Sequence, residues 1–232
     1  MPGSGRILVV VAHPDDAEFG CAGSLARWVA EGQEVFYCVA TSGNRGSEDP
    51  AMTPERLAAI REAEQRAAAG TLGVKDLVFL GYPDGELEDT REARRDVVRA
   101  IRRFRPDRIV TQNPFPSLNP YSGHRDHRHA GRLALDAVYP YARDRLHFPE
   151  LLAEGWQPHK VREVYVMGHA EPDTFVDVSA TMEQKLAALR CHASQLKDFG
   201  VVEGLVRQRA ADVGKPHGYT YAEAFRLIEF PR

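Results

Sequence analysis

Short apolar runs alternate along the 232-residue chain with longer segments in which apolar residues recur every three or four positions. Runs of the first kind predict buried strands, and segments of the second kind predict amphipathic helices. The predicted strands cover residues 6–12, 34–40, 76–80, 107–112, 161–167 and 224–230. The predicted helices cover residues 19–31, 54–72, 91–104, 127–138 and 180–196.

The helix at 54–72 illustrates how its ends and its inner face are predicted. Thr53 and Pro54 are typical of an N-cap and a first helical position, and Gly73 is typical of the residue after a helix. The inner face is predicted from helical spacing to consist of Leu57, Ile60, Glu64, Ala67, Ala68 and Leu72.

Strands that alternate with helices predict parallel strand-helix-strand units with right-handed connections. The expected fold is therefore α/β, a Rossmann-like open and mostly parallel sheet with helices on both faces. A single domain over residues 1–232 is expected, because the chain can bury a sizeable core and contains no repeat or linker-like tract.

Unusual polar sequence follows four of the predicted strands. AHPDD (12–16) follows the first strand, TSGNRGS (41–47) the second, LGYPDG (80–85) the third, and a long stretch (112–131) the fourth. Open α/β sheets bind ligands beyond the carboxyl ends of their strands. We therefore expect these four segments at one edge of the sheet.

Composition narrows the classes of partner and compartment. A formal net charge of -3 and a pI of about 6.3 argue against nucleic acid or an anionic membrane as the main partner. No segment reaches the roughly 18 apolar residues that a membrane span requires. Three cysteines without CxxC spacing argue against a disulfide framework and for a reducing compartment, so a cytoplasmic protein is expected.

The segment AHPDDAEFG ends a predicted buried strand with a histidine and two adjacent carboxylates. Pro14 favours an extended backbone at His13 and fixes a turn after it. His13 and Asp16 can then point into one cleft, where Asp15 and Asp16 repel each other unless a cation is present. A second interpretation is structural, with Asp15 or Asp16 capping the following helix and favouring its dipole.

The segment GHRDHRHAG (123–131) places His124, His127 and His129 within six residues, in a chain with nine histidines. An HxxH pair is a moderate indication of a metal site. The structural alternative makes Asp126 the N-cap of a helix and leaves the histidines in a solvated first turn.

The two segments together predict a metal site. His13, Asp16 and His127 form a set of two histidines and one carboxylate, and three protein ligands with an open position are typical of catalytic zinc. The same ligand types also suit iron(II). Asp15 remains as a free carboxylate beside this set. Such a carboxylate can act as the general base in metal-assisted hydrolysis.

With both segments in view, the chain resembles the PIG-L / LmbE-like family of zinc-dependent N-acetylglucosaminyl deacetylases. AHPDD…G matches the first motif of that family, and HRDHRHAG matches its second motif, HxDHxxxG. Weaker matches extend over nearly the whole chain, in TSGNRG, RLAAIREAEQRAAAGTLGV, YPDGEL, KLAALRCHASQ and YAEAF. The resemblance implies a hydrolase of linear amide C–N bonds that removes the N-acetyl group from an N-acetylglucosamine-type sugar or conjugate and releases acetate.

The resemblance also implies a role for each motif residue. The implied ligands of Zn²⁺ are His13, Asp16 and His127. Asp15 would activate the zinc-bound water, and His124 would stabilise the oxyanion together with the metal. Asp126 would keep His124 charged and oriented.

Substrate contacts follow more weakly from the same resemblance. Arg61 and Asp84 resemble positions that hold sugar hydroxyls, and Asn44 lies on a loop expected to face the mouth of the cleft. A solvated helix charge at Arg61 and an ordinary Asp-Gly turn at Asp84 are the structural alternatives. Some relatives carry a tyrosine two residues before the oxyanion histidine, where this chain has Ser122, with Tyr121 one residue earlier.

Two rival functions remain open at this stage. An amidase that cleaves an amino-sugar thiol conjugate would share every catalytic residue and differ only at the mouth, in segments 115–121 and 139–156. A non-catalytic Rossmann-like binding module is disfavoured, because no GxGxxG follows the first strand and the carboxylates there would repel a pyrophosphate. The resemblance further implies a homo-oligomer, a trimer or a hexamer built from trimers, with 139–156 as the subunit contact.

Overall fold

Seven strands among the described residues, 5–115 and 123–230 of a computed structural model, form one sheet in the order β3-β2-β1-β4-β5-β7-β6. The strands are β1 (Arg6–Val11), β2 (Glu34–Thr41), β3 (Asp76–Tyr82), β4 (Arg108–Gln112), β5 (Glu163–Met167), β6 (Thr174–Asp177) and β7 (Ala222–Glu229). Strands β1 to β5 pair in parallel, and β7 runs antiparallel between β5 and β6. The predicted α/β class with an open, mostly parallel sheet is confirmed.

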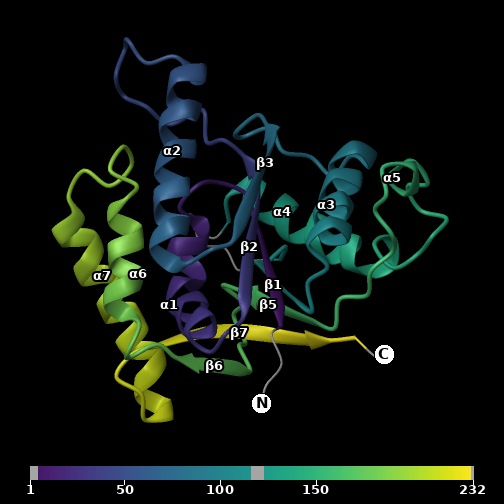
Figure 1. Cartoon of the computed structure of the whole chain (residues 1–232). Coiled ribbons are helices and arrows are strands. Elements are labelled where there is room, and N and C mark those ends of the chain that lie inside the picture. Colours follow the sequence, from purple (N-terminus) through teal and green to yellow (C-terminus); the bar gives the residue numbers. More distant parts are fainter. Residues whose placement is uncertain (1–4, 116–122, 231–232) are drawn as a thin grey trace.

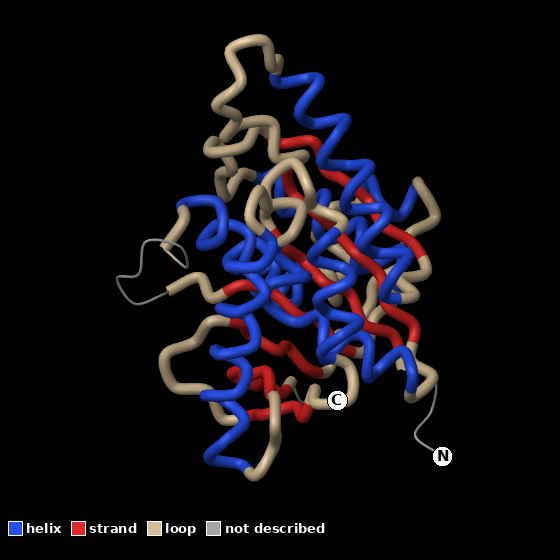
Figure 2. The backbone as a smooth tube through the Cα atoms, turned by 90° about the vertical axis from the view of Figure 1, so that its left-hand side faces the viewer, coloured by secondary structure: helices blue, strands red, loops and turns tan. Residues whose placement is uncertain are grey.

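Helices cover both faces of this sheet (Figures 1 and 2). On one face α1 and α2 pack with α6, and on the other α3 packs with α4 and a π-helical segment. The helical elements are α1 (Asp16–Ala30), α2 (Pro54–Leu72), α3 (Arg91–Phe104), α4 (Arg125–Asp136), the π-helical segment (Ala137–Tyr141), α5 (Glu150–Ala153), α6 (Met182–Arg190), α7 (Phe199–Gly214) and a 3-10 segment (Lys215–His217). No helix among these described elements is long and apolar enough to cross a bilayer.

The central strand β1 explains why the core has two layers. Leu8 and Val10 face the side of α3 and α4, whereas Ile7, Val9 and Val11 face the side of α1 and α2. All five side chains are at most 1% exposed. A parallel strand covered by helices on both faces needs such a continuous apolar run, because neither set of alternating side chains meets water.

The ends of α2 are as predicted, but its inner face is not. The Thr53 side chain accepts a hydrogen bond from the backbone N–H of Arg56, and Gly73 ends the helix with a φ of 77°. The buried stripe contains Arg61 and Gln65 in place of the predicted Ile60 and Glu64. The apolar pattern missed this register because two polar side chains are buried there. The remaining buried residues are Leu57, Ala68, Ala69 and Leu72.

Two further predicted helices differ from the structure, and two elements were not predicted. Helix α1 begins at Asp16, three residues before the predicted start, because the chain turns into the helix within the motif itself. Helix α6 spans only Met182–Arg190 of the predicted 180–196. The pattern also missed β6 and α7, which lie beyond the regular alternation of strands and helices.

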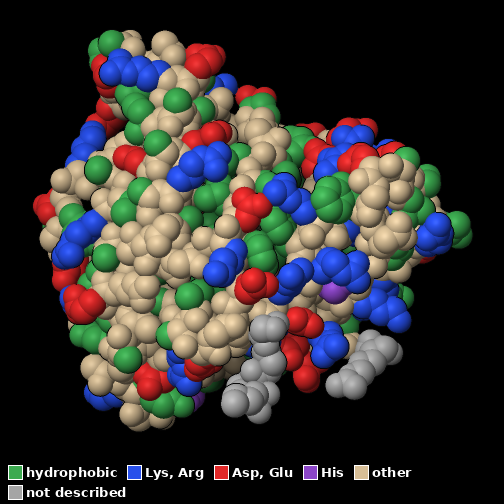
Figure 3. All heavy atoms as spheres, in the orientation of Figure 1, with side chains coloured by type: hydrophobic (Ala, Val, Ile, Leu, Met, Phe, Trp, Pro, Cys, Tyr) green, Lys and Arg blue, Asp and Glu red, His purple; other side chains and the backbone are tan. Residues whose placement is uncertain are grey.

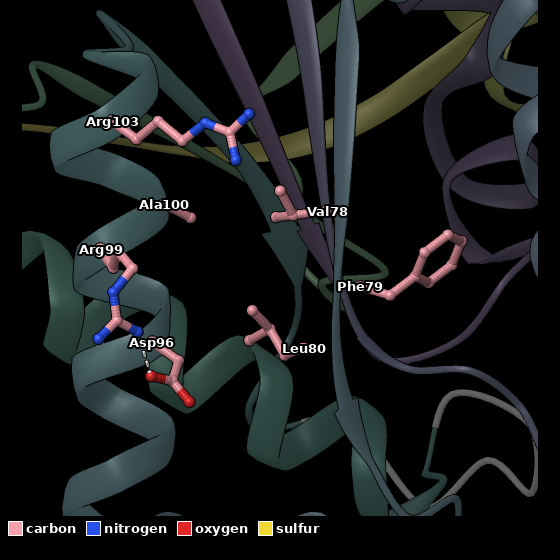
Figure 4. Close-up of a pocket in the computed structure, with 7 residues that line it drawn as sticks. All are labelled: Val78, Phe79, Leu80, Asp96, Arg99, Ala100 and Arg103. Carbon is pink, nitrogen blue, oxygen red and sulfur yellow. Dashed lines mark hydrogen bonds and ion pairs between the residues drawn. The ribbon is translucent and has the colours of Figure 1, made fainter.

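Strand β3 forms one edge of the sheet, and its side chains are mostly half-buried. A hollow of about 230 Å³ lies between β3 and α3. In Figure 4, Val78 and Leu80 point towards α3, Phe79 points to the opposite side, and Arg99 pairs with Asp96. No residue of the predicted metal site lines this hollow. Acidic and basic side chains are interspersed on the face drawn in Figure 3, in keeping with the nearly balanced charge.

The strand order places two polar segments side by side. Strand β1 lies between β2 and β4. Strands β2 and β3 follow on one side of β1, and strands β4 and β5 follow on the other side. The crevice at such a switch point lies beyond the carboxyl ends of β1 and β4. Segment 12–16 follows β1, and the turn into α4 at residues 123–125 comes after β4.

Candidate active site

Three histidines from these two segments meet at the carboxyl edge of the sheet. The ring centre of His13 lies 4.8 Å from that of His124 and 5.2 Å from that of His127, and the latter two are 5.1 Å apart. His13 is buried at the end of β1, and His124 is exposed immediately before α4. Gly131 lets α4 approach this closely, because a Cβ there would meet the carbonyl of Gln112 at the end of β4.

Asp16 joins two of the histidines on the open side of the cluster. Its Oδ2 lies 3.4 Å from Nδ1 of His13, and its Oδ1 lies 3.0 Å from Nε2 of His127. In a tetrahedral zinc site with bonds of roughly 2.0–2.1 Å, neighbouring ligand atoms are about 3.3 Å apart. The Asp16 carboxylate thus lies at comparable distances from His13 and from His127, one oxygen towards each.

His13 meets two further carboxylates on its inner side. Its Nε2 lies 3.0 Å from Oδ1 of Asp84 and 3.2 Å from Oδ2 of Asp126. Asp126 is fully buried, and its carboxylate also accepts hydrogen bonds from the backbone N–H groups of Gly85 (2.6 Å) and Leu87 (3.3 Å). A histidine that donates one ring N–H to a carboxylate can present its other nitrogen to a metal in a fixed direction.

The charges within this cluster strongly shift the pKa values of His13 and Asp16. Burial opposes the charged form of His13, yet hydrogen bonds to Asp126, Asp16 and Asp84 raise its pKa to about 12. Burial likewise opposes the charged form of Asp16, but His127 and His13 hold its pKa far below the usual range. The cluster therefore favours positive charge among its carboxylates, and a bound cation satisfies the same preference.

His13 belongs to two possible ligand sets. Its nitrogens lie within 4.8 Å of ring nitrogens of His124 and His127, and within 4.8 Å of carboxylate oxygens of Asp84 and Asp126. The first set opens to solvent, since the His127 side chain is 20% exposed and His124 is exposed. The second set is closed around Asp126, whose oxygens are already occupied by backbone N–H groups. Asp16 belongs to neither set, but it contacts two members of the first one, His13 and His127.

Asp15 has an unusual backbone conformation between His13 and Asp16, which both belong to the cluster. Its φ of 89° lies in the left-handed region, which costs a residue other than glycine about 1–2 kcal/mol. Its N–H donates to Oε1 of Gln65 (2.9 Å), and its Oδ2 lies 3.2 Å from Nη2 of Arg61. Burial, followed by repulsion from Asp16, raises the pKa of Asp15 to about 7, against the attraction of Arg61.

The structural alternatives match the structure only in part, since Asp16 and Asp126 lie in the first turns of α1 and α4, where their charge favours the helix dipole. Asp15 occupies the N-cap position of α1 but makes no capping hydrogen bond with its side chain. Asp126 is not the N-cap of α4, since that position belongs to His124. The carboxylates are thus not explained by helix capping.

Arg61 connects three of the polar segments. Its guanidinium donates to the carbonyls of Pro14 (2.8 Å) and Gly43 (3.3 Å), and its Nη1 lies 3.9 Å from Oδ2 of Asp84. Gly43 is required here, because a Cβ at this position would collide with the guanidinium. Asn44 supports the same region, since its Oδ1 accepts from the backbone N–H of Asp84 (3.0 Å).

His124 and Asp126 interact differently from the expectation. The backbone N–H of Asp126 donates to Nδ1 of His124 (3.2 Å), which leaves the ring proton on Nε2. The Asp126 carboxylate instead contacts His13, and among the described residues no hydrogen bond joins it to the His124 ring. Partial burial and the charges of His13 and His127 lower the pKa of His124, so the neutral ring is favoured. Tyr121 and Ser122 lie outside the described residues.

Sequence reasoning missed two buried polar residues at the site, Glu18 and Gln65. Gln65 contacts the backbone of Asp15, and Glu18 accepts hydrogen bonds from Gln65 and interacts with His192. The only sequence signal was a polar residue inside an otherwise small and apolar helix face. His192 is fully buried.

Comparisons with known proteins agree with this geometry. Residues 8–138 match the family model described as PIG-L, GlcNAc-PI de-N-acetylase. The chain is 36% identical over 225 residues to the diacetylchitobiose deacetylase of Thermococcus kodakarensis, an alignment that covers 96% of this chain and 83% of the relative. The chain also resembles the structure of N,N'-diacetylchitobiose deacetylase from Pyrococcus horikoshii, with a TM-score of 0.90, 32% identity, and coverage of 97% of this chain and 84% of that one.

A further structural relative has a different chemistry in its description. It is the 4-carboxy-2-hydroxymuconate hydratase from Pseudomonas putida, with a TM-score of 0.81 and 25% identity over 98% of this chain and 97% of that one. Proteins with this architecture therefore catalyse more than one reaction. The reaction of this chain has to be inferred from its site residues.

Proposed function

Because this chain belongs to the PIG-L family, we propose that it is a metal-dependent hydrolase that removes the N-acetyl group from an N-acetylglucosamine-type sugar or conjugate and releases acetate. One observation carries the proposal. The Asp15 carboxylate, which pairs with Arg61, belongs to the residue next to Asp16, and Asp16 contacts both His13 and His127. Hydrolysis of an amide needs such a base next to a Lewis acid.

The proposed ligands are Nδ1 of His13, a carboxylate oxygen of Asp16 and Nε2 of His127. We propose Zn²⁺ as the metal, since two histidines and one carboxylate with an open position are typical of catalytic zinc, while Fe²⁺ accepts the same ligand types. When bound, the metal would polarise the amide carbonyl and lower the pKa of a water molecule.

The protein side chains then perform the proton transfers. The Asp15 carboxylate takes a proton from the attacking water and passes it to the nitrogen of the leaving amine as the C–N bond breaks. Arg61 holds this carboxylate by an ion pair at 3.2 Å. Nε2–H of His124 donates a hydrogen bond to the oxygen of the tetrahedral intermediate, a contact that is strongest when that oxygen carries negative charge.

The names of two relatives support diacetylchitobiose as the first substrate to test. We propose Asn44 and Asp84 as contacts to the sugar, since both lie on loops at the carboxyl edge of the sheet and Asn44 contacts the backbone of Asp84. The buried guanidinium of Arg61 would act on the substrate through Asp15 and Asp84.

Three further features belong to the proposal: the domain organisation, the oligomeric state and the location of the protein. Residues 1–232 would act as a single domain around the one sheet. The exposed side chains of Tyr139 and Leu146 support segment 139–156 as a contact in a homo-oligomer, a trimer or a hexamer. The three cysteine thiols are free, which supports a reducing, cytoplasmic location.

The test is acetate release by protein that has been stripped of metal and reloaded with Zn²⁺ or Fe²⁺. The substrates would be diacetylchitobiose, N-acetylglucosamine, inositol- and malate-linked N-acetylglucosamine, and an amino-sugar thiol conjugate. Metal-dependent acetate release from an N-acetylated sugar is expected. Cleavage of the thiol conjugate alone would favour the amidase, and no reaction by the metal-loaded protein would overturn the proposal.

A further inference from the structure

Four polar side chains are fully buried behind Asp15, although the reaction proposed above uses none of them. They come from four elements: Glu18 from α1, Tyr37 from β2, Gln65 from α2 and His192 from the turn after α6. Buried polar groups are costly unless their hydrogen bonds are made, so such a group needs an explanation.

The side-chain amide of Gln65 can point in only one direction. Its Nε2 donates to both carboxylate oxygens of Glu18, at 3.0 and 3.1 Å. An ionised carboxylate accepts hydrogen bonds but does not donate them, so the NH₂ group of Gln65 must face Glu18. Oε1 of Gln65 must then face Asp15, where it accepts the backbone N–H at 2.9 Å.

Glu18 is itself held from behind. The hydroxyl of Tyr37 donates to its Oε1 (3.2 Å), and Nε2 of His192 lies 3.2 Å from its Oε2. A continuous chain of contacts thus runs from His192 through Glu18 and Gln65 to the backbone of Asp15. His192 lies outside residues 8–138, so the C-terminal part of the chain reaches the site through this contact.

Asp15 needs this support because of its backbone conformation. A φ of 89° is unfavourable for an aspartate, and its N–H lies at the start of a helix, where no carbonyl of the same helix can accept it. Arg61 and Gln65 are four residues apart on α2 and therefore lie on one face. Arg61 holds the Asp15 carboxylate and the Pro14 carbonyl, while Gln65 holds the Asp15 N–H.

We propose that Gln65, Glu18 and His192 are positioning residues that fix the backbone of Asp15 and hence the direction of its carboxylate. This inference rests on the proposed function only for its effect on rate. The contacts themselves predict a second effect, which needs no substrate: the Asp15 N–H is protected from exchange with solvent.

The chain provides a matched control in a second buried ion pair, that of Lys185 on α6 and Glu223 on β7, which also contacts α1. Glu223 accepts hydrogen bonds from the backbone N–H of Ser24 (2.7 Å) and from Lys185 (2.6 Å), and Lys185 also donates to the carbonyl of Phe19 (2.8 Å). Both side chains are at most 5% exposed. This pair stabilises α1 without contacting Asp15, so Glu223→Gln should lower thermal stability and leave kcat unchanged.

The experiment compares Gln65→Glu, Glu18→Gln, the double variant and Glu223→Gln by two readouts. One is hydrogen exchange of the Asp15 amide by NMR, and the other is kcat for acetate release per bound metal. In Gln65→Glu a carboxylate faces Glu18 and repels it, so faster Asp15 exchange and a kcat lower by about 10–100-fold are expected, with KM and metal content unchanged. In the double variant the amide at position 18 can donate to the carboxylate at position 65, so both readouts should return towards wild type.

The outcomes separate the two proposals. If Asp15 exchange in Gln65→Glu equals that in Glu223→Gln, or if the double variant rescues neither readout, the positioning role is overturned. If Gln65→Glu and Glu223→Gln each lower kcat only in proportion to their loss of thermal stability, then Gln65 has a structural role alone, and the positioning role is likewise overturned. If wild-type protein releases no acetate, the proposed function fails, and the exchange measurement still decides the positioning role.

Discussion

The two sides of His13 use the same residue types under opposite conditions. On the outer side, Asp16 contacts Nδ1 of His13 and Nε2 of His127, and the His127 side chain is 20% exposed. On the inner side, Asp84 and Asp126 face Nε2 of His13, and Asp126 is fully buried with backbone N–H groups on both of its oxygens. A carboxylate can bind a metal only where it has a free lone pair, and the Asp16 carboxylate accepts one backbone N–H, that of His13, whereas the Asp126 carboxylate accepts two.

The largest expected effect is on the outer side. His127→Ala removes one of three proposed ligands and should abolish stoichiometric binding of Zn²⁺, as measured by metal analysis of the purified protein. His129→Ala, two residues further along α4, is the control and should keep its metal. Equal loss in both variants would show that the helix, and not the ligand, determines metal binding.

Asp15→Asn should affect the rate and leave the metal in place. The amide cannot accept a proton from water, so kcat should fall by about 10²–10⁴-fold. The measurement is acetate release at saturating substrate, with metal content determined on the same sample. Turnover close to wild type would remove Asp15 from its role as the base.

His124→Ala should lower kcat by about 10²–10³-fold, because the tetrahedral oxygen loses a hydrogen-bond donor. His124→Gln retains an N–H donor and should lose less. Steady-state kinetics with both variants test this order. A rise in KM at constant kcat would instead place His124 in substrate binding.

The smallest effect is expected on the inner side. Asp126→Ala leaves Nε2 of His13 without one of its two carboxylates and should weaken metal affinity by about 10–100-fold, measured by competition with a chelator. If metal affinity stays unchanged while kcat falls as in His124→Ala, then Asp126 acts through His124. The contrast between the two sides of His13 would then be wrong.

The sequence alone predicted the alternation of strands and helices, because the central strands are buried on both faces and must be apolar throughout. It also predicted which segments meet at one edge of the sheet, since His13 and Asp16 follow β1 directly and His127 lies in the helix that follows β4. The strand order is known only from the tertiary structure. Because β1 and β4 are neighbours, two motifs that are more than 100 residues apart in the sequence lie close together.

Only the tertiary structure decided which carboxylate does what. Asp84, Asp126 and Asp16 are equivalent as residue types, and their roles differ because burial and backbone N–H groups differ around each. Gln65 was missed for the same reason: a glutamine on a helix is an ordinary surface residue unless packing buries it. Local patterns record which residues are apolar, whereas the partners of a buried polar group come from distant parts of the chain.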